Sequence, residues 1–272
     1  MDEDQIILVD KPAGISSFGV VAKVRGYLKA EFGHKVKVGH TGTLDPFATG
    51  LLILLSGKMT KRSNEFLKKD KIYEARLKLG YTSTTGDPEG EIEEYPRKTK
   101  ITKIEEHAKR AQYCSIEDPL RRTASNGATE PRNDRPLGRG RPPVDGREGA
   151  RPKWNDIELA LDDFIGTIQQ KVPAFSAIKI NGQRAYKLAR AGKDFDTPTR
   201  EVTIYSIDVL DHHYPYLTIR CHVSSGTYIR TLAEDIGKKL GTGAYLTSLR
   251  RTKIADYSVS SALPLSHFTT PT

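Results

Sequence analysis

The hydrophobic and polar positions along the chain follow two periods, one typical of strands and one typical of helices. Residues 71–79 (KIYEARLKL) alternate strictly, which predicts a strand with one apolar face. Residues 51–55 are continuously aliphatic between two glycines, which predicts a buried strand. Apolar residues recur at helical spacing between Ser16 or Ser17, either of which can cap a helix, and Gly33, which would end it.

The same reading extends to the rest of the chain. Further strands are expected at 5–9, 172–182 (strand and turn), 201–210, 216–223 and 250–260. Further helices are expected at 58–69, 102–113, 156–164 (capped by Asn155), 183–190 and 228–239. Strands outnumber helices and several are neighbours in hairpin order. We therefore predict an α+β fold, in which flanking helices cover a mixed, mainly antiparallel β-sheet.

One segment departs from this pattern. Residues 118–153 are rich in arginine, proline and glycine, and their only larger aliphatic side chains are Leu120, Leu137 and Val144. Such a segment cannot bury enough apolar surface to fold alone, so we expect a disordered basic insertion. It would interrupt a single domain spanning residues 1–265. Contact with RNA and a solvated surface loop are both open as interpretations of its charge.

Composition narrows the classes of protein. The 272 residues carry a formal charge of +9 and a sequence pI near 9.4, which is usual for proteins that meet nucleic acid. The two cysteines support neither a disulfide framework nor a cysteine metal site. The acidic start MDEDQ lacks a signal-peptide pattern, and no apolar run is long enough to span a membrane. We expect a cytoplasmic protein.

The sequence contains no common cofactor or metal motif. A GxxxxGK[ST] phosphate loop, an HExxH pair, zinc-ligand spacing and a GxSxG nucleophile elbow are all absent. Metal-free chemistry, or no chemistry, remains.

Asp45 stands in an unusually restricted turn. Gly42 and Gly50 permit tight backbone paths on either side, and Pro46 pushes Asp45 toward an extended conformation. A carboxylate held in this way can serve as a nucleophile or a base. Asp before Pro is also common in ordinary loops, and neighbouring threonines could simply form turn hydrogen bonds. Both interpretations stay open on the local sequence.

A carboxylate in a partly dry site needs a cation to stay ionised, and Arg230 is a candidate. It lies in the segment SSGTYIRTLAEDIG (224–237), which passes from a strand through a turn into a helix. A cation in the first helical turn is unfavourable beside the helix dipole, which suggests another use for this arginine. A plain surface arginine is the alternative.

Six segments, in order along the chain, resemble the signature blocks of the bacterial TruB-type transfer-RNA pseudouridine-55 synthases. The first two are VDKPAGISSFGVVAKVR (9–25) and GHTGTLDPFATGLLILLSGKMTK (39–61). The others are KIYEARLKLGYTSTTGD (71–87), QKVPAFSAIKINGQRAYKLARAG (170–192), VSSGTYIRTLAEDIG (223–237) and GAYLTSLRRTKI (243–254). A lone LDP would be a weak signal, but six ordered blocks cover most of the chain outside the insertion.

The resemblance implies the pseudouridine synthase fold and an isomerase that converts uridine to pseudouridine at position 55, in the T-loop of transfer RNA. No cofactor or metal is implied. The family's catalytic aspartate falls on Asp45, which attacks the nucleoside or takes a proton from the sugar. Its active-site tyrosine falls on Tyr73, which would stack on the base and help to remove the C5 proton. Its arginine partner of the aspartate falls on Arg230.

The resemblance also implies residues that bind the substrate. His40 would lie against the RNA near the extruded nucleotide, and Tyr228 and Leu249 match positions that line the uridine pocket. Lys11 and Lys61 match basic motif positions. The expected partner is the T-arm of transfer RNA. We expect the protein to be a monomer and not to bind a membrane.

The chain departs from the family pattern in two ways, and alternatives remain. The insertion is longer than the usual connection there, and we expect no C-terminal PUA-type domain. A guide-RNA-dependent pseudouridine synthase would share the fold but not the substrate. A non-catalytic chaperone that binds transfer RNA and helps it fold is an alternative of another class. A glycosidase would want two carboxylates, and the blocks offer one in a suitable turn.

Overall fold

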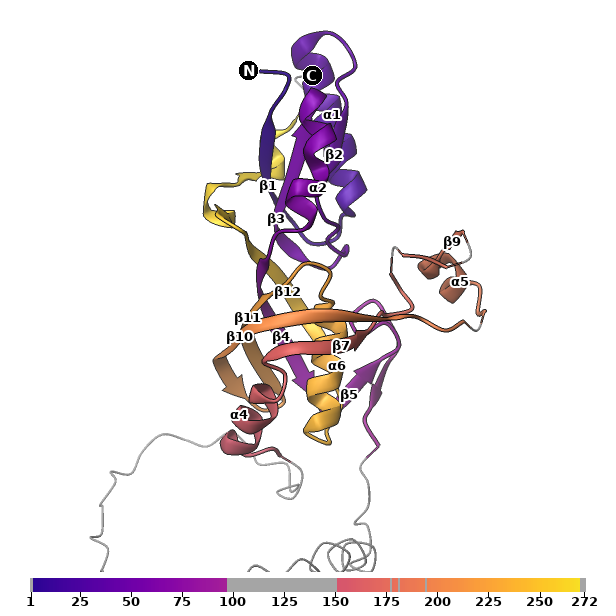
Figure 1. Cartoon of the computed structure of the whole chain (residues 1–272), viewed down its shortest axis with the longest axis vertical. Coiled ribbons are helices and arrows are strands. Elements are labelled where there is room, and N and C mark those ends of the chain that lie inside the picture. Colours follow the sequence, from indigo (N-terminus) through magenta and orange to yellow (C-terminus); the bar gives the residue numbers. More distant parts are fainter. Residues whose placement is uncertain (1, 97–150, 177, 181, 194, 270–272) are drawn as a thin grey trace, which may run out of the picture. The chain divides into compact units, whose positions relative to one another are not determined.

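Ten strands form the main sheet of this computed structural model (Figure 1). The model describes residues 2–96, 151–176, 178–180, 182–193 and 195–269. The path of the sheet runs through β14 (Leu263–Pro264), β1 (Ile6–Lys11), β3 (Thr49–Ser56), β12 (Ala244–Ile254), β4 (Lys71–Leu79), β11 (Tyr216–Val223), β10 (Thr199–His213) and β7 (Gly166–Lys171). Two strands pair off this path, β2 (Val38–His40) with β3 and β13 (Tyr257–Ser258) with β12.

The direction of these pairings confirms the predicted sheet. Only β1 with β14 and β3 with β12 are parallel in the described sheet, and the other neighbours are antiparallel. Two small hairpins stand apart from the main sheet. They are formed by β5 (Tyr81–Ser83) with β6 (Ile92–Glu94) and by β8 (Lys179–Ile180) with β9 (Gln183–Arg184).

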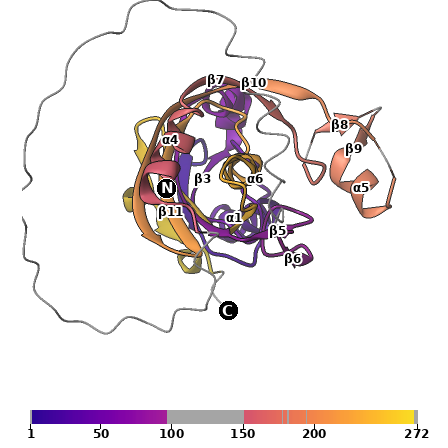
Figure 2. The same cartoon turned by 90° about the horizontal axis from the view of Figure 1, so that it is seen from below.

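Five α-helices occur in the described residues, and one of them lies beside the β8–β9 hairpin instead of on the main sheet (Figure 1). They are α1 (Ser17–Phe32), α2 (Ser63–Leu67), α4 (Trp154–Asp162), α5 (Ala185–Arg190) and α6 (Ile229–Lys239), with 3₁₀ turns η1 (Gly57–Arg62), η2 (Val259–Ser261) and η3 (Leu265–His267). Figure 2 shows α6 inside the curve made by β7, β10 and β11. No helix in the described ranges combines the length and apolar character needed to cross a bilayer.

Strand β3 explains why one aliphatic run fills two cores. Leu52 and Leu54 face the cluster under α1, whereas Leu51, Ile53 and Leu55 face a second cluster with Phe66 and Ile254. Side chains alternate between the two faces of a strand, so burial on both faces requires a continuous apolar run. The largest cluster lies between α6 and the strands from β12 to β10.

Both ends of α1 lie where the sequence predicts them. The Ser16 hydroxyl accepts a hydrogen bond from the Gly19 amide at 3.1 Å, which caps the first turn. Gly33 ends the helix in the left-handed region, with φ of 75°.

The predicted boundaries of two other helices were wrong. The helix expected over 58–69 is the 3₁₀ turn η1 followed by α2, because the Thr60 hydroxyl bonds back to the Gly57 carbonyl at 2.8 Å and favours the tighter turn. The helix expected over 156–164 begins earlier, at Trp154. The Asp156 carboxylate accepts from the Lys153 amide at 3.1 Å, so Asn155 is not its cap.

Two strands were also misplaced. A strand ends at Lys171, before the segment 172–182 in which one was expected, and among the described residues of that segment β8 is the only strand. The last long strand begins at Ala244 instead of residue 250 and pairs along β4. The helix predicted at 102–113 and almost all of the predicted insertion lie outside the described residues.

Candidate active site

The loop that carries Asp45 is fastened to the start of α1. The Ser17 hydroxyl accepts from the Leu44 amide at 2.8 Å and donates to the Leu44 carbonyl at 2.9 Å. The carbonyl of Pro46 accepts from the Gly14 amide at 2.9 Å and from Lys11 Nζ at 3.1 Å. Both residues that flank Asp45 are therefore held in place, which limits where its carboxylate can point.

Arg230 comes from the opposite end of the sequence and meets this loop. Its Nε lies 3.1 Å from Asp45 Oδ2, and its side chain is only 5% exposed. It stands in the first turn of α6, where Gln170 clamps the backbone of Tyr228 by accepting from its amide and donating to its carbonyl. The expected closeness of Asp45 and Arg230 is thus present in the structure.

Both terminal nitrogens of the guanidinium also have partners. Nη2 donates to the Phe175 carbonyl at 2.7 Å, and Nη1 donates to the Thr85 carbonyl at 3.0 Å. Nη1 also contacts Asp87 Oδ2 at 3.2 Å. Five donors in a rigid plane suit this arrangement of two carboxylates and two carbonyls, whereas a lysine could not reproduce it.

Asp87 is a residue that sequence reasoning missed. Its side chain is only 4% exposed, and its Oδ1 accepts from the Thr85 hydroxyl at 2.5 Å and from the Glu89 amide at 3.0 Å. Gly86 has a φ of +74°, a backbone conformation that favours glycine, and it lies close to Arg230 and Glu234 of α6. The available signal was a second aspartate before a proline, as at Asp45.

The electrostatics of the pair balance burial against charge. Burial raises the pKa of the Asp45 carboxyl, and the Arg230 guanidinium opposes that rise. The Asp45 side chain is 35% exposed, which limits the cost of burial, and the guanidinium 3.1 Å away favours the ionised carboxylate. Lys11 is buried, which lowers its pKa to about 8, although the Asp45 charge favours its protonated form.

Tyr73 and Leu249 line the apolar side of the same region. Tyr73 is on β4 and 8% exposed, and it belongs to one buried cluster with Leu249 of β12 and with Leu44 and Ala48 from the Asp45 loop. The structure therefore places Tyr73 and Leu249 in the same cluster as two residues of the Asp45 loop.

His40 and Lys61 lie further out. His40 ends β2, and its ring packs edge-on against Phe18 with 5.0 Å between centroids. Burial lowers the pKa of His40, and so does the nearby Arg251. Lys61 is exposed in η1, and among the described residues it forms no ion pair with the other candidates. Its predicted role has no support from this geometry.

The site is a carboxylate held by a guanidinium beside a buried apolar cluster. In the described ranges, no group of three histidine, cysteine or acidic side chains is arranged to hold a metal ion. The Asp45 carboxylate can act as a nucleophile or accept a proton, and an aromatic surface lies in the same cluster.

Solved structures share this fold. The chain resembles one in the structure titled "Crystal Structure of a Cbf5-Nop10-Gar1 Complex", with a TM-score of 0.59 and 24% identity over 97% of this chain and 53% of that one. A second match, titled "Structure of H/ACA RNP bound to a substrate RNA containing 2'-deoxyuridine", has a TM-score of 0.55 and 22% identity over 96% and 51%. At these identities the likeness supports the fold alone.

Relatives found by sequence share a higher identity with this chain than these structures do. Proteins named "tRNA pseudouridine synthase B" from Bifidobacterium longum, Cupriavidus pinatubonensis and Phocaeicola vulgatus are 37%, 38% and 37% identical. The matches cover 93%, 96% and 98% of this chain. The chain spans 64% and 65% of the length of the first two relatives and 92% of the third.

Two family models account for most of the chain. The model described as "TruB family pseudouridylate synthase (N terminal domain)" matches residues 28–123 and 144–229. The model described as "tRNA pseudouridylate synthase B C-terminal domain" matches residues 230–270. The division between them falls at Arg230, so the two models meet at the residue that contacts Asp45. The chain belongs to the TruB family of pseudouridylate synthases.

Proposed function

We propose that this protein isomerises uridine to pseudouridine at position 55, in the T-loop of transfer RNA. The bond between C1′ and N1 breaks, the uracil turns while held, and a bond forms between C1′ and C5. The C5 proton leaves to a base and N1 gains a proton, so atoms balance without a cofactor or metal. The single observation that carries this proposal is the buried Arg230 guanidinium 3.1 Å from the Asp45 carboxylate.

The proposed roles are those that the family resemblance implies. Asp45 attacks the nucleoside or takes a proton from the sugar, and Arg230 keeps its carboxylate ionised and oriented. Tyr73 stacks on the uracil and assists removal of the C5 proton. Leu249 and Tyr228 line the pocket.

Access to C5 and C1′ requires that the uridine leave its stack. Enzymes that act on a base commonly extrude it into a pocket, and the unstacking energy is recovered through aromatic and apolar contacts. Tyr73 and Leu249 belong to one apolar cluster beside the Asp45 loop, which supports this step. His40 would lie against the RNA near the extruded nucleotide, and Lys11 would add positive charge beneath the loop.

The activity is tested with unmodified transfer-RNA transcript. The native protein should form pseudouridine at the T-loop uridine, and Asp45→Ala should form none while still binding the RNA. Asp235→Asn is a matched control, because Asp235 is a partly exposed acid on the same helix as Arg230 and pairs only with Lys238. It should leave the rate unchanged.

Three results would contradict the proposal. Product from Asp45→Ala would remove Asp45 from the nucleophile or base role. Binding of transfer RNA by the native protein, without any product, would favour the chaperone alternative. A requirement for an added guide RNA would favour a guide-dependent synthase.

A further inference from the structure

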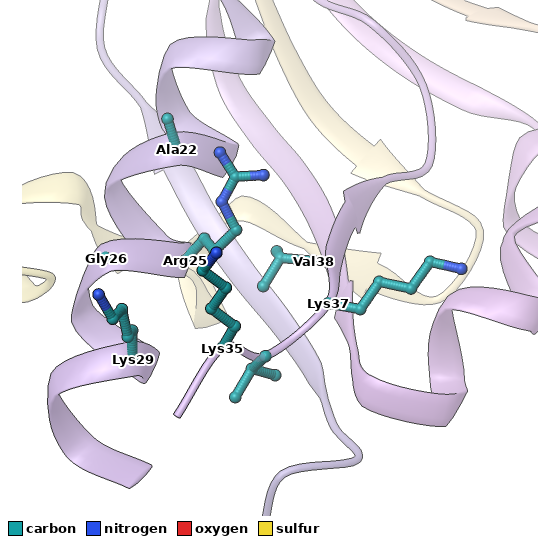
Figure 3. A pocket seen from close by; sticks show the side chains of 8 residues that line it. Ala22, Arg25, Gly26, Lys29, Lys35, Lys37 and Val38 are labelled. Atoms are coloured by element: carbon teal, nitrogen blue, oxygen red, sulfur yellow. The ribbon is translucent and has the colours of Figure 1, made fainter. Parts of the chain in front are cut away.

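A basic cleft of about 590 Å³ lies outside the candidate active site, between α1 and the segment that leads into β2 (Figure 3). Arg25 and Lys29 line it from the helix, and Lys35 and Lys37 line it from the segment opposite. The residues between these cations are alanine, glycine and valine, so the floor is short and apolar and the charges stand at the rim.

The cations have no acidic partners to neutralise them. All four side chains are exposed, and none forms an ion pair with a carboxylate within the part of the chain that the structure describes. Figure 3 shows Arg25 and Lys35 over the seam between helix and strand, with Lys29 on the helix side, whereas Lys37 extends away from α1. Three unneutralised charges around one hollow repel one another and attract an anion.

Ordinary surface chemistry accounts for only part of this cluster. Lys29 stands in the last turn of α1, where a cation interacts favourably with the helix dipole. That reason does not extend to Arg25, one turn earlier, or to Lys35, which lies on another segment. The four basic side chains border one cleft, and no acidic residue lines it.

A short strand links the cleft to His40, one of the predicted substrate-binding residues. Val38, which lines the cleft, begins the three-residue strand that ends at His40. The exposed ring of Phe18, at the start of α1, packs against His40 at the far end of the same seam. Phe18 and Lys29 are eleven positions apart on α1, which corresponds to about 16 Å along the helix.

We propose that this cleft binds the phosphodiester backbone of the substrate RNA, next to the nucleotide that enters the active site. The inference rests on the proposed function, because it takes the RNA that reaches Asp45 as the occupant. Charge at the rim matches phosphate, and an apolar floor without hydrogen-bonding side chains suits contact that ignores base sequence. The exposed Phe18 ring at the end near His40 offers a surface on which a base can stack.

The test compares two triple variants that remove the same charge. The cleft variant is Arg25→Gln, Lys29→Gln and Lys35→Gln. The control variant is Lys23→Gln, Lys68→Gln and Lys69→Gln, three exposed lysines outside the cleft. Equilibrium binding of unmodified transfer-RNA transcript is measured from 50 to 300 mM salt, and pseudouridine formation is measured in single turnover at saturating protein. Thermal unfolding of both variants verifies that they fold.

The cleft variant should bind at least about tenfold more weakly at 100 mM salt. Its slope of log K against log salt should flatten by about 2, since each lost phosphate contact removes roughly 0.7 to 0.9. The control should change much less, and the single-turnover rate of both variants at saturation should match that of the native protein, because no cleft residue contacts Asp45.

Equal affinity and slope in the cleft and control variants would overturn the inference, while pseudouridine formation by the native protein would leave the proposed function standing. If the native protein neither binds transfer RNA nor modifies it, the proposed function fails and this inference fails with it. Binding of polyglutamate is measured as a probe for an acidic polypeptide. If the cleft variant loses polyglutamate binding but binds RNA as the native protein does, the cleft would be assigned to an acidic polypeptide and the inference would be overturned.

Discussion

Replacing Asp87 by asparagine removes one negative charge beside Arg230 and changes almost nothing else. The Oδ1 atom that accepts from Thr85 and Glu89 can remain an acceptor in the amide. The group facing Arg230 Nη1, now 3.2 Å away as a carboxylate oxygen, becomes an NH₂ donor. Two donors then face each other in a site where both side chains are about 95% buried.

The expected cost follows from what Arg230 keeps. Removing one partner of a buried ion pair typically costs about 3–5 kcal/mol, because a buried charge loses its compensation. Arg230 retains Asp45 and the carbonyls of Thr85 and Phe175, so the loss is closer to one charge-assisted hydrogen bond. We expect the free energy of unfolding to fall by about 2–3 kcal/mol, which corresponds to a decrease in Tm of about 5–10 °C.

The rate should fall more than the stability suggests. Arg230 would turn from Asp87, and Asp45 would lose the orientation of its carboxylate, for which a loss of about 100-fold is expected. Urea unfolding at pH 7 and single-turnover pseudouridine formation measure the two effects. Thr85→Val is the matched control, since it removes the hydroxyl bond to Asp87 but keeps both contacts to Arg230.

The control sets the threshold for refutation. Thr85→Val should cost about 1 kcal/mol and leave the rate near native. If Asp87→Asn costs no more than Thr85→Val and keeps its rate within threefold of native, then Asp87 does not hold Arg230 in place and the reasoning is wrong.

Three further predictions concern other parts of the fold. Burial lowers the pKa of Lys71 to about 8, below its unfolded value of 10.5. Between pH 8 and 10.5 the unfolded state therefore binds more protons than the native state, so the free energy of unfolding should rise with pH in this range. Lys71→Met should lack that rise in urea titrations at several pH values. Burial raises the pKa of Cys221 to about 12, so its thiol should resist Ellman's reagent in the folded protein and react only on unfolding; rapid native-state labelling at this cysteine would contradict its burial. Gly50 has a φ of +102°, and a Cβ there would lie 2.3 Å from the Arg251 carbonyl, so Gly50→Ala should lower stability by more than about 3 kcal/mol in thermal unfolding, while Gly26→Ala, where nothing lies within 4 Å, should not.

The parts of the fold that local chemistry determines were predictable. Strict alternation in β4, the aliphatic run of β3 and the serine and glycine caps of α1 each depend on a few neighbouring residues. The prediction of one helix over residues 58–69 failed because a hydroxyl hydrogen bond within one turn outweighed the helical period of the sequence. The predicted start of the last long strand was wrong because pairing with β4, which is far away in sequence, makes the strand begin at Ala244.

The site was predictable only in part. Asp45 could be singled out from its flanking glycines and proline, and Arg230 was a candidate from its place in the first helical turn. The resemblance added the pairing of these two residues and the role of Tyr73. Asp87 carries the same Asp-Pro signal, yet its importance depends on Arg230, which lies 143 positions away. A contact of that length leaves no period or motif in the chain, so local patterns cannot reveal it.

The position of β12 sets the order in which this protein can be assembled. β12 is the strand that joins β1 and β3 to β4, β11, β10 and β7 in the described sheet, and it comes late in the chain. Until Ala244–Ile254 has emerged from the ribosome, the two half-sheets have no common strand. At 5–20 residues per second, about 10–40 s separate the synthesis of Asp45 from that of Arg230. For most of its synthesis the nascent chain therefore contains Asp45 without Arg230, the residue that contacts it in the folded protein.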